Sequence, residues 1–224
     1  MRDFPGIILT ATVWAYWLGA GGMVVRLRRK SRSSAGLIPE QPLERLMWLV
    51  WVPLVVAWNV LPYLAVVRRV PSLRVPNFAL EEPAYAALRA AAALAATVCV
   101  ILTAWCWARM GKSWSMAVSE RNRGELITDG LFARVRHPIY SLSMLLMVCS
   151  AVVVPTPPVV AIALVHIWLM RLKARSEERH LLKVHGDAYA SYLRRTGRFV
   201  PRFGATGPEP RAGPCPPDSP RCGH

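Results

Sequence analysis

The chain has 224 residues, 54% of them hydrophobic, and a formal net charge of +15. This apolar content excludes an ordinary soluble domain, because the apolar residues are gathered in uncharged runs and not spread in amphipathic patterns. The charge does not indicate a nucleic-acid-binding protein, since the basic residues lie beside apolar segments and no recognition helix or aromatic and basic platform accompanies them.

Three long apolar runs fill the first half of the chain, at 5–25, 47–67 and 90–108. Each approaches the roughly 20 helical residues needed to cross a bilayer. The third can extend backward through Tyr85 if Arg89 snorkels to the interface. Small residues at 19–22 resemble a signal-peptide cleavage site, but the basic residues that follow are typical of a stop-transfer flank.

Two shorter apolar runs follow at 139–154 and 159–170, and a proline cluster at 155–158 separates them. Because proline lacks the donor that a helix interior needs, this cluster predicts the turn of a helical hairpin. We therefore expect an all-α, polytopic membrane helix bundle of about five transmembrane helices, with the fourth and fifth spans as a hairpin and a cytoplasmic C-terminal amphipathic helix.

Basic residues are concentrated at 26–45, at 109–136 and after 171, which are alternate loops of a five-span protein. Cytoplasmic loops carry such an excess, so we expect the C-terminus in the cytoplasm. The loop at 68–82 also contains basic residues, which is weak evidence against this orientation. The five cysteines show no zinc-binding spacing, and no metal site is expected. The Pro- and Gly-rich tail, 204–224, is expected to be disordered.

The first polar segment, 109–140, ends in Arg136-His137-Pro138-Ile139-Tyr140. Proline suits the first turn of a helix, so His137 is expected near the N-cap of the fourth span. Such a helix end favours an anionic or hydroxylated ligand, which Arg136 and His137 would reinforce. An interfacial anchor is an equal alternative, because Arg and Tyr commonly flank spans.

The second polar segment, 171–202, has an amphipathic pattern that predicts a surface helix interrupted near Gly186. Glu177 follows Lys173 by four residues and Glu178 follows Arg175 by three, which is the spacing of ordinary surface ion pairs. Both carboxylates also lie close to the membrane exit, and we expect them to face Tyr140 across one pocket.

Asn59 and His166 are the polar exceptions inside the spans. An ionisable residue within a membrane is a functional candidate, so His166 is a possible pocket residue. Hydrogen bonding across helices would explain either residue equally well.

Together the two polar segments resemble the isoprenylcysteine carboxyl methyltransferase family and its relatives, which include phospholipid methyltransferases. The resemblance covers roughly the C-terminal half and is carried by segments 111–114, 126–130, 136–140, 177–178, 186–192 and 198–201. It implies a core at 109–203, preceded by three spans at 1–108. The family motif continues RHPxYxG, whereas Ser141 and Leu142 follow here, which puts in question the close approach that glycine allows.

The resemblance implies an S-adenosylmethionine site facing the cytoplasm. The implied cofactor contacts are Gly124, Glu125, Leu126, Ile127, Phe132, Arg136, His137, Pro138, Ile139, Tyr140, Glu177 and Glu178. Lys173 or Arg175 would meet the substrate, and His137 would remove a proton from a hydroxyl acceptor.

The expected activity is O-methylation of a carboxyl or hydroxyl group on an amphiphilic isoprenoid, lipid or polyketide-like molecule. The substrate would reach the pocket from the bilayer, and the composition is typical of a bacterial plasma-membrane protein. An NADPH-dependent membrane reductase of the sterol-reductase type is an alternative, as is a non-catalytic membrane protein.

Overall fold

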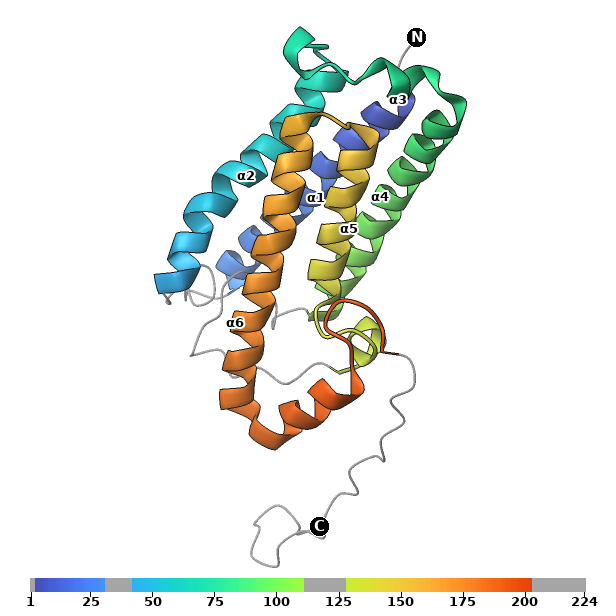
Figure 1. The fold of residues 1–224 in the computed structure, drawn as a ribbon. Coiled ribbons are helices and arrows are strands. Elements are labelled where there is room, and N and C mark those ends of the chain that lie inside the picture. The colour runs from blue at the N-terminus through green and yellow to red at the C-terminus, as the bar shows by residue number, and fades with distance from the viewer. Residues whose placement is uncertain (1–2, 31–41, 111–127, 203–224) are drawn as a thin grey trace, which may run out of the picture.

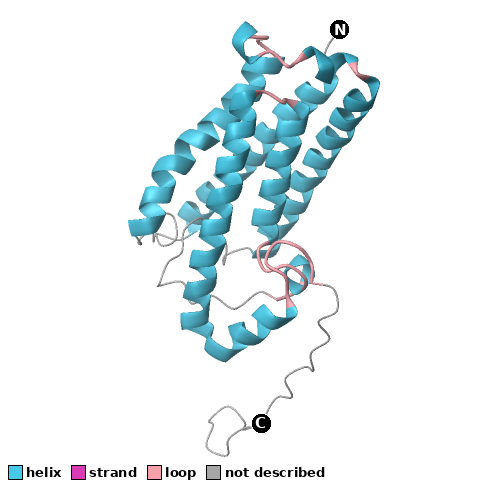
Figure 2. Cartoon of the chain, in the orientation of Figure 1, coloured by secondary structure: helices cyan, strands magenta, loops and turns pink. Residues whose placement is uncertain are grey.

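The computed structural model describes residues 3–30, 42–110 and 128–202 and shows a bundle of helices (Figure 1). Figure 2 shows no strand in the described part of the chain. Two short 3-10 turns, Pro71–Leu73 and Gly130–Ala133, accompany the helices. The helices are α1 (Phe4–Lys30), α2 (Pro42–Val66), α3 (Asn77–Glu81), α4 (Pro83–Met110), α5 (Pro138–Val153) and α6 (Pro157–Arg195).

The five long helices pack side by side in a closed bundle. α1 packs against α2 and α4, α5 packs between α4 and α6, and α6 returns to pack against α2. Because the chain reverses direction between successive long helices, the start of α1 and the end of α6 lie at opposite ends of the molecule (Figure 1). The expectation of an all-α polytopic bundle is confirmed.

Within the residues that the structure describes, four helices are long and apolar enough to cross a membrane: α1, α2, α4 and α6. α5 is apolar but has 16 residues. At 1.5 Å per residue it is about 24 Å long, which is less than a hydrocarbon core of about 30 Å. The fifth expected span is therefore present as a shorter helix inside the bundle.

The hairpin between α5 and α6 is confirmed, but its turn is shorter than the proline cluster suggested. α5 ends at Val153, and α6 already begins at Pro157. Two prolines fit the first turn of α6 because the N–H groups there have no intrahelical partner. The hairpin brings the start of α5 and the polar part of α6 to the same end of the bundle (Figure 1).

Two polar residues of the spans have structural partners. α4 extends back to Pro83 as expected, but Arg89 does not snorkel to the interface. It is 3% exposed, its Nη2 lies 2.6 Å from Asp3 Oδ2, and its Nε donates to the Val153 carbonyl at 2.8 Å. A buried guanidinium requires such partners. Asn59 Nδ2 donates to the Val55 carbonyl at 2.8 Å, within its own helix.

α6 has 39 residues, and its polar half continues along the helix axis beyond the bundle (Figure 1). Gly186 has φ 52° and ψ −125°, a conformation that essentially only glycine adopts. The chain turns back at this residue, which buries Tyr189 and Tyr192. The interruption expected near Gly186 is confirmed, and it returns the C-terminal segment to the start of α5.

Candidate active site at the start of α5

The segment that follows α6 contacts the backbone of residues 136–140, which we call the RHPIY motif. The backbone N–H of Arg136 donates to the Gly197 carbonyl at 2.9 Å, and that of His137 donates to the Arg198 carbonyl at 3.2 Å. A Cβ at Gly197 would lie 1.7 Å from the carbonyl oxygen of Val200, so glycine is required for this close approach. The two segments thus fix the backbone that leads into α5.

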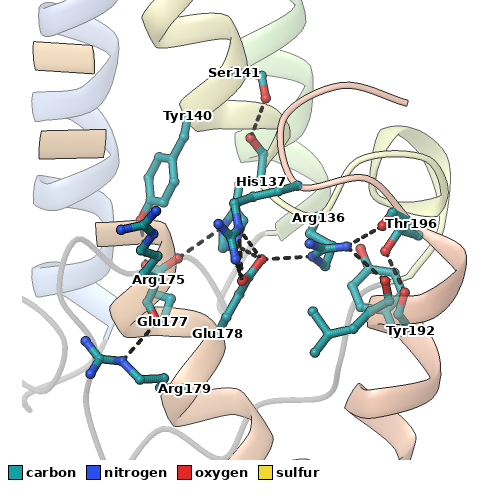
Figure 3. Close-up of polar contacts among 12 residues, drawn as sticks. Arg136, His137, Tyr140, Ser141, Arg175, Glu177, Glu178, Arg179, Tyr192 and Thr196 are labelled. Carbon is teal, nitrogen blue, oxygen red and sulfur yellow. Dashed lines mark hydrogen bonds and ion pairs between the residues drawn. The ribbon is translucent and has the colours of Figure 1, made fainter. Parts of the chain in front are cut away.

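Glu178 joins these segments through two arginines (Figure 3). Arg136 Nε donates to Glu178 Oε1 at 2.9 Å, while Arg198 Nε donates to both carboxylate oxygens at 3.0 Å and its Nη2 reaches Oε2 at 2.5 Å. Arg136 Nη1 also donates to the carbonyls of Leu193, at 3.1 Å, and Thr196. Glu178 is only 6% exposed, and we call this arrangement with Arg136 and Arg198 the arginine clamp.

The clamp determines the charge of Glu178. Burial alone would raise the pKa of this carboxyl group, but the contacts with His137, Arg198 and Arg136 hold its pKa well below the usual range. Glu178 is therefore a carboxylate at neutral pH, and its oxygens are already engaged by protein donors.

Glu177, the neighbouring residue, faces the RHPIY motif. The Tyr140 hydroxyl donates to Glu177 Oε1 at 2.5 Å, and His137 Nδ1 lies 3.3 Å from Oε2 (Figure 3). The rings of His137 and Tyr140 stack with centroids 5.3 Å apart and planes 6° apart. The expectation that this motif and the paired glutamates lie together is confirmed. Glu177 keeps 24% of its side chain exposed.

His137 lies between the two carboxylates. Its Nε2 is 3.4 Å from Glu178 Oε1, an ion-pair distance without hydrogen-bond geometry. Burial of the ring would lower the pKa of His137, but the two glutamates outweigh this effect and raise it. Conversely, burial opposes ionisation of Glu177, yet His137, Lys173 and Tyr140 lower its pKa. The site therefore favours an imidazolium beside a carboxylate.

His137 is the N-cap residue of α5, as expected, and its side chain makes no cap hydrogen bond there. The first-turn N–H groups after Pro138 have no intrahelical partner, so they face outward from the helix end. Ser141 Oγ donates back to the His137 carbonyl at 3.0 Å. Leu142, which stands where the family has glycine, packs against the hydrophobic core.

A cavity of about 100 Å³ lies between the helices next to this site. Ile139, Tyr140 and Lys173 line it beside the glutamates, and Ser143 and His166 line it further along α5 and α6. His166 Nε2 lies 2.9 Å from Ser143 Oγ, which is the hydrogen bond between helices considered for this residue.

The structure separates the two basic candidates. Lys173 lines the cavity and affects the pKa of Glu177. Arg175 is exposed, and its carbonyl accepts from Arg179 Nε at 3.4 Å. Lys173 is thus the basic residue positioned next to both the carboxylate and the cavity.

Two of the remaining expected cofactor contacts, Phe132 and Pro138, belong to the described part of the chain. Phe132 and Pro138 are buried, and the Phe132 carbonyl accepts from the Tyr192 hydroxyl at 2.5 Å. The expected contacts at Gly124, Glu125, Leu126 and Ile127 lie outside the described residues. The sequence reading did not select Arg198 or Tyr192, although both lie in the segments that carry the resemblance.

The fold and this site define an integral membrane helical protein with a histidine and two carboxylates at one end of its bundle. Residues 91–183 match the isoprenylcysteine carboxyl methyltransferase (ICMT) family. The match runs from α4 through most of α6 and contains His137, Tyr140, Lys173 and both glutamates. It confirms the resemblance over this stretch, which is under half of the chain.

The chain is also similar to the nickel-cobalt-cadmium resistance protein NccN of Alcaligenes xylosoxydans xylosoxydans, with 30% identity over 97 residues. The aligned part is 43% of this chain and 46% of that protein, so it spans under half of either. Among the residues that the structure describes, no group of three or more His, Cys, Asp or Glu side chains is placed to hold a metal ion.

Proposed function

We propose that the protein is a methyltransferase that uses S-adenosylmethionine to methylate an oxygen of a lipophilic molecule taken from the bilayer. The observation that carries this proposal is the contact between Tyr140 and Glu177, 2.5 Å long, inside the segment that matches the methyltransferase family. It brings a partly exposed carboxylate, an aromatic pair and a helix N-terminus together beside one cavity.

These groups fit the chemistry of the cofactor. The helix N-terminus at the start of α5 suits its carboxylate, and the exposed part of Glu177 suits its ammonium group. The stacked rings of His137 and Tyr140 include an aromatic face for a sulfonium, an attraction worth about 0.5–2 kcal/mol. In this proposal Glu178 and Arg136 position the site through the arginine clamp and do not themselves touch the cofactor.

When bound, the cofactor supplies an electrophilic methyl group. The protein's part is to align the acceptor oxygen and keep water out, because an in-line displacement depends on positioning. Lys173 would orient an anionic acceptor from the cavity wall. His137 is a poor general base at neutral pH, since the two glutamates raise its pKa. We therefore favour an acceptor that is already ionised, such as a carboxylate, over a neutral alcohol.

We also propose that this end of the bundle faces the cytoplasm. The basic residues of the polar half of α6 and of residues 128–137 lie at this end, and cytoplasmic ends carry such an excess. Residues 109–203 would then form the catalytic core, with the first three spans completing the acceptor cavity.

Ligand protection separates this proposal from the alternatives. We expect S-adenosylhomocysteine to raise the Tm of the purified protein in detergent and NADPH to leave it unchanged. Glu177→Gln should abolish the protection, whereas Glu81→Gln, on an exposed position of α3, should retain it. Protection by NADPH alone would support a reductase, and protection by neither ligand would support a non-catalytic protein.

The role of Lys173 can be tested by kinetics. Lys173→Met should lower kcat/KM for the acceptor by about 10- to 100-fold, the effect of removing a charged hydrogen-bond donor. Arg175→Met is the matched control on the exposed side of the same helix and should be nearly silent. Affinity for S-adenosylhomocysteine should change little in either variant, and equal losses of both functions would contradict a substrate role for Lys173.

A further inference from the structure

The cavity beside Lys173 extends into the bundle, where tryptophans from the first two helices line it. Trp17 of α1 and Trp48 and Trp51 of α2 contribute to its wall, opposite Ser143 and His166. Its volume of about 100 Å³ far exceeds the roughly 10–15 Å³ that one water molecule needs. The cavity is therefore large enough to accept part of an organic molecule.

Three buried nitrogen atoms that belong to residues lining the cavity have no hydrogen-bond partner within the described part of the chain. They are Trp17 Nε1, Trp51 Nε1 and His166 Nδ1. Other tryptophans of the bundle are satisfied: Trp58 Nε1 donates to Ser150 Oγ at 3.0 Å, and Trp14 Nε1 donates to the Asn59 carbonyl at 3.1 Å. Buried polar groups are normally paired, so three unpaired ones around a single cavity indicate a ligand.

The chemistry of these atoms constrains the ligand. An indole nitrogen can only donate, so a partner for Trp17 and Trp51 must be a hydrogen-bond acceptor such as a carbonyl or ether oxygen. His166 Nδ1 can donate when its Nε2 accepts from Ser143. An unbranched hydrocarbon chain has no acceptor and would leave all three atoms unpaired.

The aromatic wall adds a preference for shape. Trp17 and Trp51 lie edge to face, with ring centroids 5.4 Å apart and an interplanar angle of 66°. Trp48 packs against Trp51 with centroids 5.9 Å apart. Faces and edges arranged in this way favour a planar ring through offset or edge-to-face contacts.

We propose that this cavity binds the ring of the methyl acceptor, a planar oxygen-substituted ring whose carbonyl or ether oxygens accept hydrogen bonds from Trp17, Trp51 and His166. The lipophilic remainder extends into the bilayer. A separate, ionised oxygen of the same molecule, a carboxylate or phenolate, lies toward Lys173 and Tyr140 and displaces the methyl group from the sulfonium, which leaves as the neutral thioether. This inference rests on the proposed function, because it assigns the substrate class of the same site.

Equilibrium dialysis of the purified full-length protein in detergent tests the proposal with three probes. 1,4-Naphthoquinone has a ring with acceptor oxygens, naphthalene has the ring alone, and decane is an unbranched chain without an acceptor. We expect saturable binding of naphthoquinone that exceeds that of both other probes, after subtraction of partition into protein-free micelles.

Conservative variants test the hydrogen bonds. Trp17→Phe and Trp51→Phe each keep a ring but lose the donor, and each should weaken naphthoquinone binding by about threefold to tenfold. Without ligand, their Tm values should equal or exceed that of the wild type, because an unpaired buried donor is removed. Trp168→Phe, on the exposed side of α6 and outside the cavity, is the matched control and should bind like the wild type.

Equal binding of naphthoquinone and naphthalene, equal binding of decane, or donor-deleted variants that bind like the wild type would overturn the proposal. S-adenosylhomocysteine binding is measured on the same samples. If that ligand binds and naphthoquinone does not, this inference fails and the proposed function stands. If naphthoquinone binds through the donors and S-adenosylhomocysteine does not, the methyltransferase proposal fails instead.

Discussion

Glu177 and Glu178 are neighbours in the chain with different surroundings. Replacing each by glutamine should separate a role in ligand binding from a role in stability. Glu178→Gln removes the buried charge of the arginine clamp, and loss of one partner of a buried ion pair costs about 3–5 kcal/mol. Arg136 keeps its hydrogen bonds to the carbonyls of Leu193 and Thr196, and Arg198 is 37% exposed. The lower end of this energy range therefore applies. We expect a loss of about 3 kcal/mol, or a fall in Tm of about 6–12 °C for a chain of this size.

Glu177→Gln should behave in the opposite way. Its side chain is 24% exposed, and an amide oxygen can still accept from Tyr140, so the loss should be about 1 kcal/mol or less. Binding of S-adenosylhomocysteine should nevertheless disappear, because the carboxylate that meets the cofactor's ammonium group is gone.

Thermal unfolding followed by tryptophan fluorescence, at one detergent concentration, and isothermal titration with S-adenosylhomocysteine measure the two effects. A Glu178→Gln variant that unfolds within about 2 °C of the wild type, a loss of about 1 kcal/mol or less, would refute the stabilising role of the arginine clamp. A Glu177→Gln variant that binds the ligand normally would refute the role of Glu177 in binding.

Two further variants test the local geometry. Because the pKa of His137 is raised above its ordinary value of about 6.5, its stabilising charge is present below that pH and is lost as the pH rises through the folded-state pKa. The Tm of the wild type should therefore fall more steeply than that of His137→Asn as the pH rises above about 6.5, and parallel profiles would contradict this assignment. Gly197→Ala places a Cβ against the Val200 carbonyl, and we expect a lower Tm together with weaker S-adenosylhomocysteine binding; a variant like the wild type in both would show that the segment relaxes without consequence.

The contact between Tyr140 and Glu177 follows from features visible in the sequence. The apolar runs and the prolines between them predict a hairpin, and a hairpin returns its two polar ends to the same side. Pro138 places the helix start one residue after His137, as observed. These features depend only on residues close together in the chain, so they can be predicted from a single sequence.

The different roles of the two glutamates could not be read in this way. Successive residues on a helix point about 100° apart, and the rotation of α6 is set by its packing against α2 and α5. Arg198 reaches Glu178 only because the chain reverses at Gly186 and then passes Arg136. Such contacts depend on tertiary structure and carry no local signal.

The aromatic cavity was hidden for a related reason. Tryptophans in membrane spans commonly anchor a helix at the interface, and sequence does not distinguish these from residues that face inward. Trp14 and Trp168 are indeed exposed on the bundle, whereas Trp17 and Trp51 line the cavity. The unpaired indole nitrogens are visible only once the helices are packed.

Transfer of a methyl group is the central claim, and it can be measured directly. Membranes containing the wild type, Glu177→Gln or Glu81→Gln are incubated with methyl-labelled S-adenosylmethionine, and label in the organic extract is counted and identified by mass spectrometry. The account predicts a labelled lipophilic product with the wild type and Glu81→Gln and none above background with Glu177→Gln. Equal label in all three, or no label dependent on the protein, would contradict it.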